Sequence, residues 1–593
     1  MDGALEMFQQ ALTIQKKVLG KEHTNTAKAY SFIGRVMYEL GKLDHALNIH
    51  GEALAIRQNI LGEKHSDTAE SYRSLGAVME GKGDLNGALE MYQKDLVINE
   101  ELYGKDHPET ATSYNNLGMV MDLKGDSDGA LQWYKQALGI REKIMGKEHT
   151  DTASSYYNIG LVLQTMGNLD GALQMHEECA AVYKKVLGEE HPYAAASYNK
   201  IGSVKHAMGD LDGAQDFLQK AINIQEKALG KEHPATAESY NDLGSVMCDV
   251  GNMDGALQMF QQALSIREKV FGMYHPDTAA SYKNIGTQLY NKGDLNGALP
   301  MFENALDIYK KILGRSHQNT ATAYYNIGLV MQAAGDSEGA LQMHERGVAI
   351  YKKVLGEEHP LTAESYNKIG MAEYAMGELE NALEMLQKAI NIQEKVLGKE
   401  HPATAESYND LGSVMFDLGD LDGAMLICDK AVTIREKVLG MEHPDTAASY
   451  HNIGTQLYRK GDLDGSLQLF ETALAIQEKA LGIDHYYTAT SYKNIGLVKG
   501  AMGDVVGALQ IFEKSLPNIK RVHGMEHPDT AECYDNIGIA KYQSGDLDGA
   551  LEMLQQALAI REKVFGMDHP STAESHNKIS LLVKARTDME HSL

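Results

Sequence analysis

The sequence predicts an all-α fold, a right-handed superhelical solenoid built from tandem helix-turn-helix units. Three observations lead to this prediction: a histidine that returns every 42 residues, an apolar stripe with helical spacing in each unit, and glycines that recur where each helix would end. Self-similarity at a fixed period of this length is typical of repeat architectures.

The repeat length does not vary along the chain. The histidine of a Gly-x-x-His phrase lies at positions 23, 65, 107, 149, 191, 233, 275, 317, 359, 401, 443, 485, 527 and 569. In a stack where each unit contacts only its neighbours, a changed repeat length would misplace the next helix, whereas a changed side chain is tolerated. The constant step therefore indicates one continuous array over residues 1–593.

This register divides the array into three parts. Residues 1–23 form an N-terminal half repeat, which is the second helix of a hairpin and its loop. Residues 24–569 form thirteen 42-residue hairpins. Residues 570–593 form a C-terminal half repeat, which is a first helix followed by a polar tail.

The first helix of each hairpin, here called helix A, is illustrated by residues 152–166. Tyr156, Ile159, Gly160 and Leu163 have the i, i+3, i+4, i+7 spacing of one apolar stripe. The helix is expected to end at Gly167, because glycine adopts the left-handed conformation of a C-terminal cap without a steric penalty.

The second helix, helix B, follows in the sequence NLDGALQMHEECAAVYKKVLG and ends at Gly188. Ala172, His176, Cys179 and Val182 fill its inward column. The loop EEHP then connects helix B to the next helix A, since proline cannot continue the helix. The Asp, Ser and Thr residues that follow are expected to cap the next helix A. Pro517 is expected to kink or break the helix B in which it lies.

Small and aromatic residues recur in fixed columns. A glycine inside helix A, such as Gly160, is unfavourable in an isolated helix, so its recurrence predicts a close backbone approach to helix B. Ala172 and its equivalents supply the matching small surface. A tyrosine column beginning at Tyr30, Tyr72 and Tyr114 is interpreted as packing between the helices and not as a ligand site.

Composition excludes several classes of function. The net charge of -27 disfavours nonspecific binding to nucleic acid or to anionic membranes. Four widely spaced cysteines without a CxxC motif indicate neither disulfides nor a thiolate metal site, which fits a reducing, cytoplasmic location. The sequence contains no apolar run of membrane-spanning length, and no export signal is expected at its N-terminus.

The repeated motifs resemble a known family. The pattern Tyr-x-x-Ile/Leu-Gly, the turn Gly-Asp-Leu-Asp-Gly-Ala-Leu and the segment NLGMVMDLKGDSDGALQWYKQALGI at residues 116–140 resemble the tetratricopeptide repeat. The unit is longer than the common 34-residue form, and this longer version is similar to the repeats of kinesin light chains. The resemblance implies a protein-binding scaffold, because such repeats serve many partners.

The histidine column is not expected to bind a metal. Successive helical layers lie about 8–10 Å apart, whereas zinc needs several ligands at about 2.0–2.3 Å. The phosphate loop, the His-Glu-x-x-His pair and the Gly-x-Ser-x-Gly elbow are also missing from the sequence. We therefore expect no catalytic residues, no metal and no cofactor.

If helix A lines the concave face, as the resemblance implies, two variable columns would face a groove. Asparagine can donate to and accept from an extended backbone, and tyrosine offers contact area with little entropy loss. We predict that an extended segment of a partner protein binds there. The candidate groove residues are Asn199, Asn241, Tyr290, Tyr325, Asn367, Tyr374, Asn409, Phe416, Tyr458 and Tyr542.

Two alternatives stay open. A terminal helix A of one molecule could dock on the initial helix B of the next, giving a structural protein that assembles head to tail, although a monomer is the expected state. A cargo adaptor similar to kinesin light chains is the other alternative. Nucleic acid and membrane partners are not expected.

Overall fold

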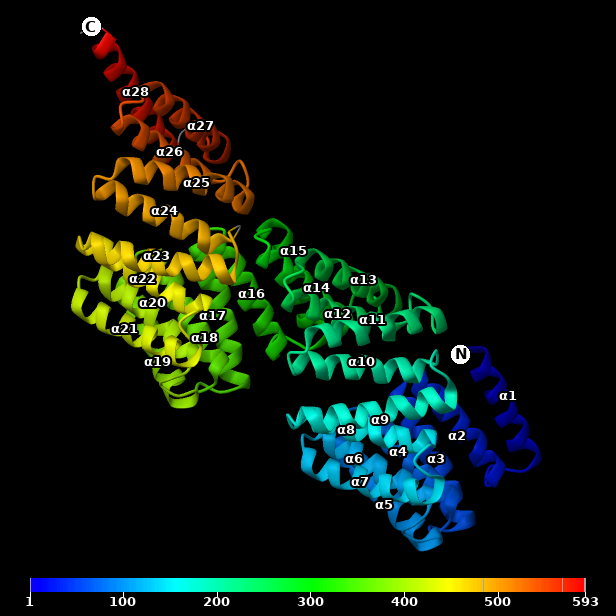
Figure 1. Cartoon of the computed structure of the whole chain (residues 1–593). Helices are drawn as coiled ribbons and strands as arrows, with labels where there is room; N and C mark the ends of the chain where they lie inside the picture. Colours follow the sequence, from blue (N-terminus) through cyan, green and yellow to red (C-terminus); the bar gives the residue numbers. More distant parts are fainter. Residues whose placement is uncertain (1, 484, 568, 591–593) are drawn as a thin grey trace. The chain divides into compact units, whose positions relative to one another are not determined.

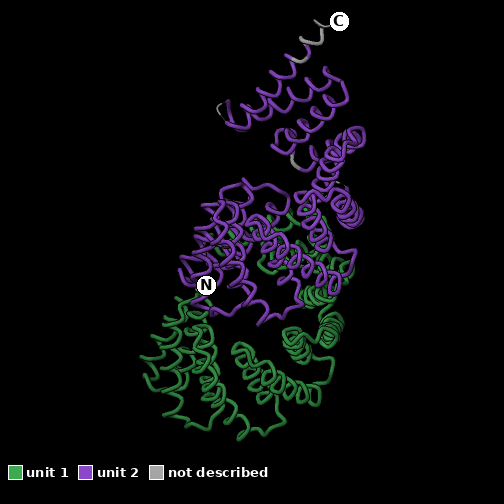
Figure 2. Tube along the Cα trace, turned by 90° about the vertical axis from the view of Figure 1, so that its left-hand side faces the viewer, with its two compact units in different colours: residues 1–273 green, residues 274–593 purple. Residues whose placement is uncertain are grey.

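The computed structural model describes residues 2–483, 485–567 and 569–590, and all regular structure within these ranges is α-helix. The chain divides into two compact units, residues 1–273 and residues 274–593 (Figures 1 and 2). The division falls in the loop that joins one hairpin to the next.

The helices of the first unit are α1 (Asp2–Val18), α2 (Thr24–Glu39), α3 (Leu43–Leu61), α4 (Ser66–Gly81), α5 (Leu85–Tyr103), α6 (Pro108–Leu123), α7 (Ser127–Met145), α8 (Thr150–Thr165), α9 (Leu169–Leu187), α10 (Pro192–Ala207), α11 (Leu211–Ala228), α12 (Pro234–Asp249) and α13 (Met253–Phe271). The helices of the second unit are α14 (Pro276–Asn291), α15 (Leu295–Ile312), α16 (Gln318–Ala333), α17 (Ser337–Val354), α18 (Pro360–Ala375), α19 (Leu379–Val396), α20 (Pro402–Asp417), α21 (Leu421–Val438), α22 (Pro444–Lys460), α23 (Leu463–Ala480), α24 (Tyr486–Ala501), α25 (Val505–His523), α26 (Pro528–Gln543), α27 (Leu547–Phe565) and α28 (Pro570–Glu590).

Even-numbered helices are helix A and odd-numbered helices are helix B, and the repeats are numbered from the hairpin of α2 and α3. Within each unit, every helix A packs against the helix B that follows it, and each helix B packs against the next helix A. Consecutive A helices also touch, as α2 and α4 do in the first unit and α18, α20 and α22 do in the second. This stacking confirms the all-α solenoid of helical hairpins.

Each helix A from α2 to α26 begins at the repeated histidine. In α20, His401 is the N-cap residue, and its Nδ1 accepts a hydrogen bond from the backbone N–H of Ala403 at 3.2 Å. Thr404 is fully buried, and its hydroxyl donates to the carbonyl of Gly398 at 3.1 Å. The prediction that Asp, Ser or Thr would cap helix A is therefore wrong, because the histidine caps the helix and the threonine closes the loop.

Removing one of these caps is expected to destabilise its hairpin. His401→Ala should lower the free energy of unfolding by about 1 kcal/mol, since the first turn of α20 loses an acceptor. His401→Asn supplies an equivalent acceptor and should retain most of the stability. Urea unfolding followed by circular dichroism measures both, and equal losses in the two variants would contradict the capping role.

The turn between the helices of a hairpin follows the predicted glycine cap. In the repeat used above, Gly167 has a φ of +77°, and its N–H donates to the carbonyl of Gln164 at 3.0 Å. The next residue, Asn168, caps α9, because its side chain accepts from the N–H of Gly171 at 3.0 Å. Glycine is needed here because a residue with a Cβ rarely adopts this φ.

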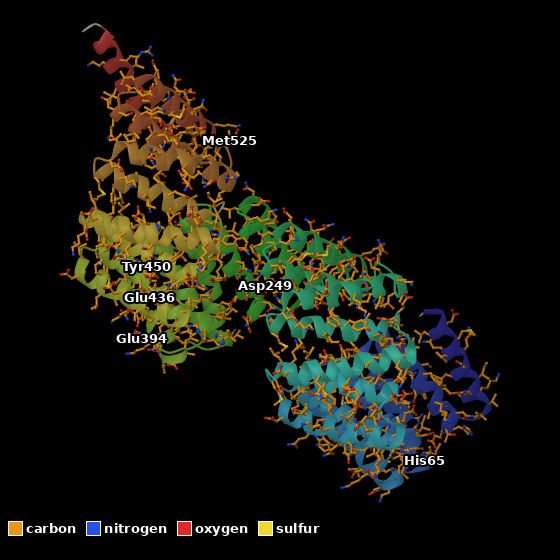
Figure 3. The ribbon with its side chains drawn as sticks, viewed as in Figure 1. His65, Asp249, Glu394, Glu436, Tyr450 and Met525 are labelled. Atoms are coloured by element: carbon orange, nitrogen blue, oxygen red, sulfur yellow. The ribbon has the colours of Figure 1, made fainter. Side chains whose placement is uncertain are left out.

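The tyrosine column lies in the core, as predicted. Twelve of its thirteen members are between 1% and 8% exposed, and Tyr324 is half-buried. In α22, the hydroxyl of Tyr450 donates to Glu436 of α21 at 2.5 Å, and both residues are labelled in Figure 3. Burial, followed by the bond to Glu436, raises the pKa of Tyr450 to about 12. The ring therefore packs between helices while its hydroxyl reaches a partner at the edge.

The glycine inside helix A makes room mainly for a side chain. A Cβ placed on Gly244 would lie 2.8 Å from Cε1 of Phe260, which belongs to the facing helix B. Where that column holds leucine, as at Leu386, a Cβ on Gly370 would also lie 3.1 Å from the carbonyl oxygen of Ala382. The predicted close approach to the backbone of helix B is seen at Gly202, Gly370, Gly412 and Gly538, where a Cβ would lie 3.1–3.3 Å from a carbonyl oxygen of that helix.

The helix that contains Pro517 is not interrupted. Helix α25 runs from Val505 to His523. The hydroxyl of Ser515, which lies just before the proline, donates to the carbonyl of Phe512 at 2.9 Å. A break at Pro517 was the wrong expectation, because proline removes one N–H donor while the neighbouring helices still pack on both sides of α25.

Candidate functional site

Three asparagines of the predicted groove are buried between A helices. Asn199, Asn367 and Asn409 are each 3% exposed. The amide nitrogen of Asn367 donates to Ser407 at 3.1 Å and to Asp410 at 2.8 Å, and both partners belong to the next helix A. The nitrogen of Asn409 likewise donates to Ser449 at 2.7 Å. The amide nitrogens therefore join neighbouring repeats, while the Oδ1 atoms of all three residues are buried without a hydrogen-bond partner. A role of these residues in peptide binding stays a prediction.

A charged network surrounds these bonds in the second unit. Lys368 of α18 forms an ion pair with Glu406 of α20 at 3.0 Å. Burial raises the pKa of Asp410 to about 6, although Lys368 and the amide of Asn367 favour its charged form. In the first unit, Asn199 donates to Ser239 at 3.0 Å and to Asp242 at 3.1 Å, an equivalent arrangement. The network holds successive A helices at a fixed spacing.

Two further predicted residues lie on the same column and are less buried. Asn241 of α12 is half-buried. Tyr325 of α16 is also half-buried, and its hydroxyl donates to Glu364 of α18 at 2.5 Å. Tyr325 also contacts the edge of the His344 ring at a centroid distance of 5.5 Å. This tyrosine keeps part of its ring on the A-helix face.

The second predicted column places an aromatic residue at the same position of three consecutive A helices. Tyr374 of α18, Phe416 of α20 and Tyr458 of α22 occupy equivalent positions, and we call these three residues the aromatic cluster. Phe416 is 9% exposed, whereas Tyr374 and Tyr458 are half-buried. The cluster therefore combines one anchored ring with two rings that remain accessible.

An ion pair fixes this cluster. Asp417 accepts from the hydroxyl of Tyr374 at 2.6 Å and from Arg459 at 2.6 Å. The Arg459 guanidinium also lies 4.9 Å from the centre of the Phe416 ring. A cation at this distance from an aromatic ring is attracted to its face. Asp417 and Arg459 thus orient the rings from neighbouring repeats.

Asp417 and Arg459 were missed by the sequence analysis. They occupy one column in successive repeats, 42 positions apart, with opposite charges. That pairing was a usable signal, because residues one repeat apart in a solenoid lie side by side.

Two other predicted residues lie apart from the aromatic cluster. Tyr290 of α14 is half-buried. Tyr542 of α26 is 49% exposed and, with Ile539 and Leu581, lines an apolar cavity of about 250 Å³. Both belong to the second unit, where they lie on the A-helix face outside repeats 9 to 11.

Ionisable residues in the described ranges do not gather into a metal centre. Within those ranges, no group of three or more His, Cys, Asp or Glu side chains is placed to hold a metal ion. Each capping histidine instead uses its Nδ1 for the backbone of its own repeat, as His65 does at 3.1 Å (Figure 3).

Helical hairpins stacked in register, with fixed glycine, alanine and tyrosine columns, define a helical repeat protein. The sequence model of the tetratricopeptide repeat matches residues 1–59, 46–96, 67–143, 151–227, 193–269, 236–290, 277–353, 339–395, 361–437, 445–521 and 494–563. These matches span most of the chain, which therefore belongs to the tetratricopeptide repeat family.

Several solved structures are similar to parts of this chain. BtubC (BKLC) from P. vanneervenii is 22% identical with a TM-score of 0.35, covering 40% of this chain and 94% of that chain. A putative kinesin light chain from Podosopora anserina with nearly identical TPR-like repeats is 28% identical with a TM-score of 0.30, covering 35% of this chain and 97% of that chain. A single-residue variant of that protein gives the same identity and TM-score, with 98% of that chain covered. No curated protein matches the sequence.

Among the described residues, no helix has both the length and the apolar character that a membrane-spanning helix needs.

Proposed function

We propose that this protein is a noncatalytic scaffold that binds extended segments of partner proteins along the face formed by its A helices. The proposal places the main contact on the aromatic cluster of the second unit. The single observation that carries it is the presence of Tyr374, Phe416 and Tyr458 in one column of three adjacent A helices.

The cluster has the properties of a binding surface that is organised before the partner arrives. Asp417 and Arg459 hold the rings of Tyr374 and Phe416, so these two rings lose little side-chain entropy on binding. Tyrosine and arginine are also among the residues most often found at the energetic centre of protein interfaces. The buried asparagines support the site indirectly by setting the spacing of the A helices.

The spacing of the rings suggests what a partner segment looks like. Neighbouring helices pack about 8–10 Å apart, and an extended chain advances about 3.3 Å per residue. An extended segment crossing α18, α20 and α22 would therefore meet a new ring after about two to three residues, and because successive side chains point to opposite faces, every second residue would face the rings. Apolar side chains repeated at that interval are the expected sequence feature of the partner.

The test uses a random peptide display library selected against the full chain. Peptides recovered with the wild type should bind a Tyr374→Ala/Tyr458→Ala variant at least about tenfold more weakly, since each lost aromatic anchor costs more than about 1 kcal/mol. Fluorescence polarisation with the same labelled peptides gives both dissociation constants.

The matched control is Tyr193→Ala, which removes an aromatic ring that is 58% exposed at the start of α10. This variant should bind the selected peptides like the wild type. Equal affinity of the wild type and the double variant would reject the aromatic cluster as the binding site. Circular dichroism of all three proteins establishes that the fold is retained.

A further inference from the structure

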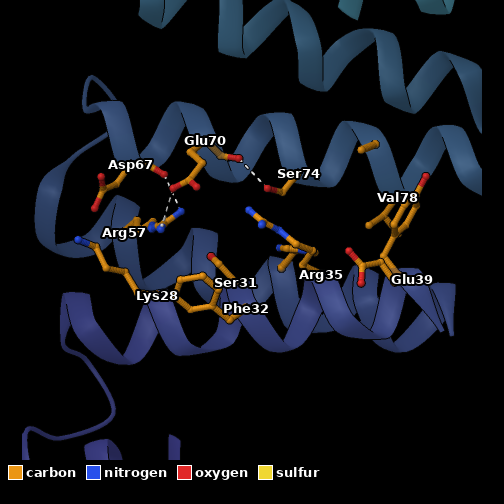
Figure 4. Close-up of a pocket in the computed structure, with 13 residues that line it drawn as sticks. Lys28, Ser31, Phe32, Arg35, Glu39, Arg57, Asp67, Glu70, Ser74 and Val78 are labelled. Atoms are coloured by element: carbon orange, nitrogen blue, oxygen red, sulfur yellow. Dashed lines mark hydrogen bonds and ion pairs between the residues drawn. The ribbon is translucent and has the colours of Figure 1, made fainter. Parts of the chain in front are cut away.

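A polar cavity of about 560 Å³ lies between α2, α3 and α4 in the first unit (Figure 4). It belongs to repeats 1 and 2, whereas the proposed peptide site lies in the second unit. Its walls combine charged groups with the apolar side chains of Phe32, Tyr38 and Val78.

One side chain that bridges neighbouring A helices elsewhere is shorter beside this cavity. In repeat 10, Asn409 reaches across to Ser449 of the next helix A, and Arg435 of helix B donates to the same hydroxyl at 2.8 Å. In repeat 1, Arg57 donates to the equivalent Ser71 at 2.7 Å, but the residue equivalent to Asn409 is Ser31. The hydroxyl of Ser31 has no hydrogen-bond partner, so this residue does not bridge α2 to α4 as Asn409 bridges α20 to α22.

Arg57 forms the floor of this space. The side chain is 2% exposed. One terminal nitrogen donates to the carbonyl of Asp67 at 2.8 Å, and the other donates to Glu70 at 3.1 Å. Its Nε, however, is buried without a hydrogen-bond partner.

Two more buried polar atoms in the cavity wall have no partner. They are the hydroxyl oxygen of Ser31 and Nδ1 of His50, a residue that is 4% exposed. Arg35 of α2 adds a second guanidinium, which forms no ion pair or hydrogen bond with the described residues. Figure 4 shows the guanidinium groups of Arg35 and Arg57 both directed into the space between α2 and α4.

The charges around the cavity set the kind of ligand. Lys28, Arg35 and Arg57 are balanced by Glu39, Asp67 and Glu70 over the whole lining. Glu70 is already paired with Arg57, and Glu39 and Asp67 lie at opposite ends of the space in Figure 4. The centre therefore holds two guanidinium groups against one carboxylate, which leaves one positive charge to be matched.

We propose that this cavity binds an oxyanion, a carboxylate or phosphate group of a ligand, between Arg35 and Arg57. Arginine binds both groups through paired N–H donors, and the bonds are stronger than those between neutral partners. Ser31 and His50 line the same space, and Phe32, Tyr38 and Val78 contact the carbon portion of the ligand. This site is independent of the peptide-binding function proposed above.

The proposal is tested with acetate and inorganic phosphate as probes. Thermal unfolding of the full chain is measured at constant ionic strength against chloride, over a range of each anion. The melting temperature of the first unit should rise along a saturable curve for at least one anion, since ligand binding to the folded state stabilises it. The anion with the lower apparent dissociation constant identifies the group.

Two variants make the test specific. Arg35→Gln should raise the apparent dissociation constant at least about tenfold, because one of the two guanidinium groups is lost. Ser31→Asn keeps both arginines but should place an amide beside Ser71 and Arg57, as Asn409 does beside Ser449 and Arg435 in repeat 10, so the anion is displaced and its stabilising effect should disappear while the protein stays folded. Lys105→Gln, which removes an exposed cation in the loop after α5, is the control and should respond like the wild type.

The outcomes separate clearly. Saturable stabilisation that is lost in Arg35→Gln and in Ser31→Asn supports the site. A response no larger than that to chloride, or one that persists in both variants, overturns it. Peptide binding at the aromatic cluster is measured separately, so failure of one proposal leaves the other standing.

Discussion

Replacing Gly118 with alanine is expected to destabilise its hairpin by about 1 kcal/mol, the net of an overpacking cost and a gain in helix propensity. A Cβ at this position of α6 would lie 2.8 Å from Cδ1 and 2.9 Å from Cε1 of Tyr134 in α7. Tyr134 is only 4% exposed, so its ring has no free volume into which it can move. Overpacking a core costs about 1–3 kcal/mol and outweighs the gain of about 1 kcal/mol that alanine brings to an isolated helix.

The same repeat offers a matched control for this experiment. Gly139 lies inside α7 on the exposed surface, and a Cβ there would have no atom within 4 Å. Gly139→Ala should therefore raise the free energy of unfolding by about 1 kcal/mol, because only the helix propensity changes. Chemical unfolding of both variants and of the wild type measures these changes in the free energy of unfolding. A loss of stability in both, or in neither, would show that the close packing at Gly118 is not the cause.

The repeat register and the helix boundaries could be read from the sequence because the signals are local and occur in every unit. The φ of Gly167 and the burial of Tyr450 follow from a turn and from a stripe within one hairpin. The period also identifies which residues are equivalent. These features depend on interactions within about twenty residues, which a periodic sequence displays directly.

The candidate site depended on contacts between repeats, and these were harder to predict. Polar residues lie along the whole length of helix A, beside its packed apolar stripe. The repeat period alone does not show which of these polar residues contact the next hairpin. Asn367 was assigned to the groove because it is polar and variable in type, yet it bonds to Ser407, 40 residues away. The aromatic cluster was identified because rings of equivalent residues gather wherever three repeats share the type.

The cavity at repeats 1 and 2 was not predicted either, and the reason is physical. Ser31 looks like one more small polar residue in a variable column. Its effect depends on the distance to α4 and on Arg57, which comes from helix B. The loss of one hydrogen bond between neighbouring helices changes neither the composition nor the periodicity of the sequence, so it cannot be predicted from them.

Acidification is expected to destabilise the protein through histidines that are buried in a neutral form. His176 and His344 are 0% exposed, and neither ring nitrogen of either residue has a hydrogen-bond partner. Burial, followed by the positive charges of Lys200 near His176 and Lys368 near His344, lowers the pKa of each imidazole from 6.5 to about 4. Tyrosine rings contact the edges of both imidazoles and carry no charge that would favour protonation.

The sign of the effect follows from where the proton binds more tightly. The unfolded chain takes up a proton near pH 6.5, whereas the folded chain does so only near pH 4. The stability that each neutral imidazole provides is therefore complete above pH 6.5 and is lost as the pH falls from 6.5 toward 4. A difference of about 2.5 pKa units corresponds to about 3 kcal/mol for each histidine.

Phenylalanine fits the same column, since Phe260 and Phe302 occupy it beside Gly244 and Gly286. The His176→Phe/His344→Phe variant should therefore fold and should lose less stability than the wild type between pH 6.5 and pH 4, by up to about 3 kcal/mol in each unit. Urea unfolding at a series of pH values measures this difference. All other ionisable groups are the same in both proteins, so their effects cancel in the comparison, and identical pH profiles would show that the two buried rings are not responsible.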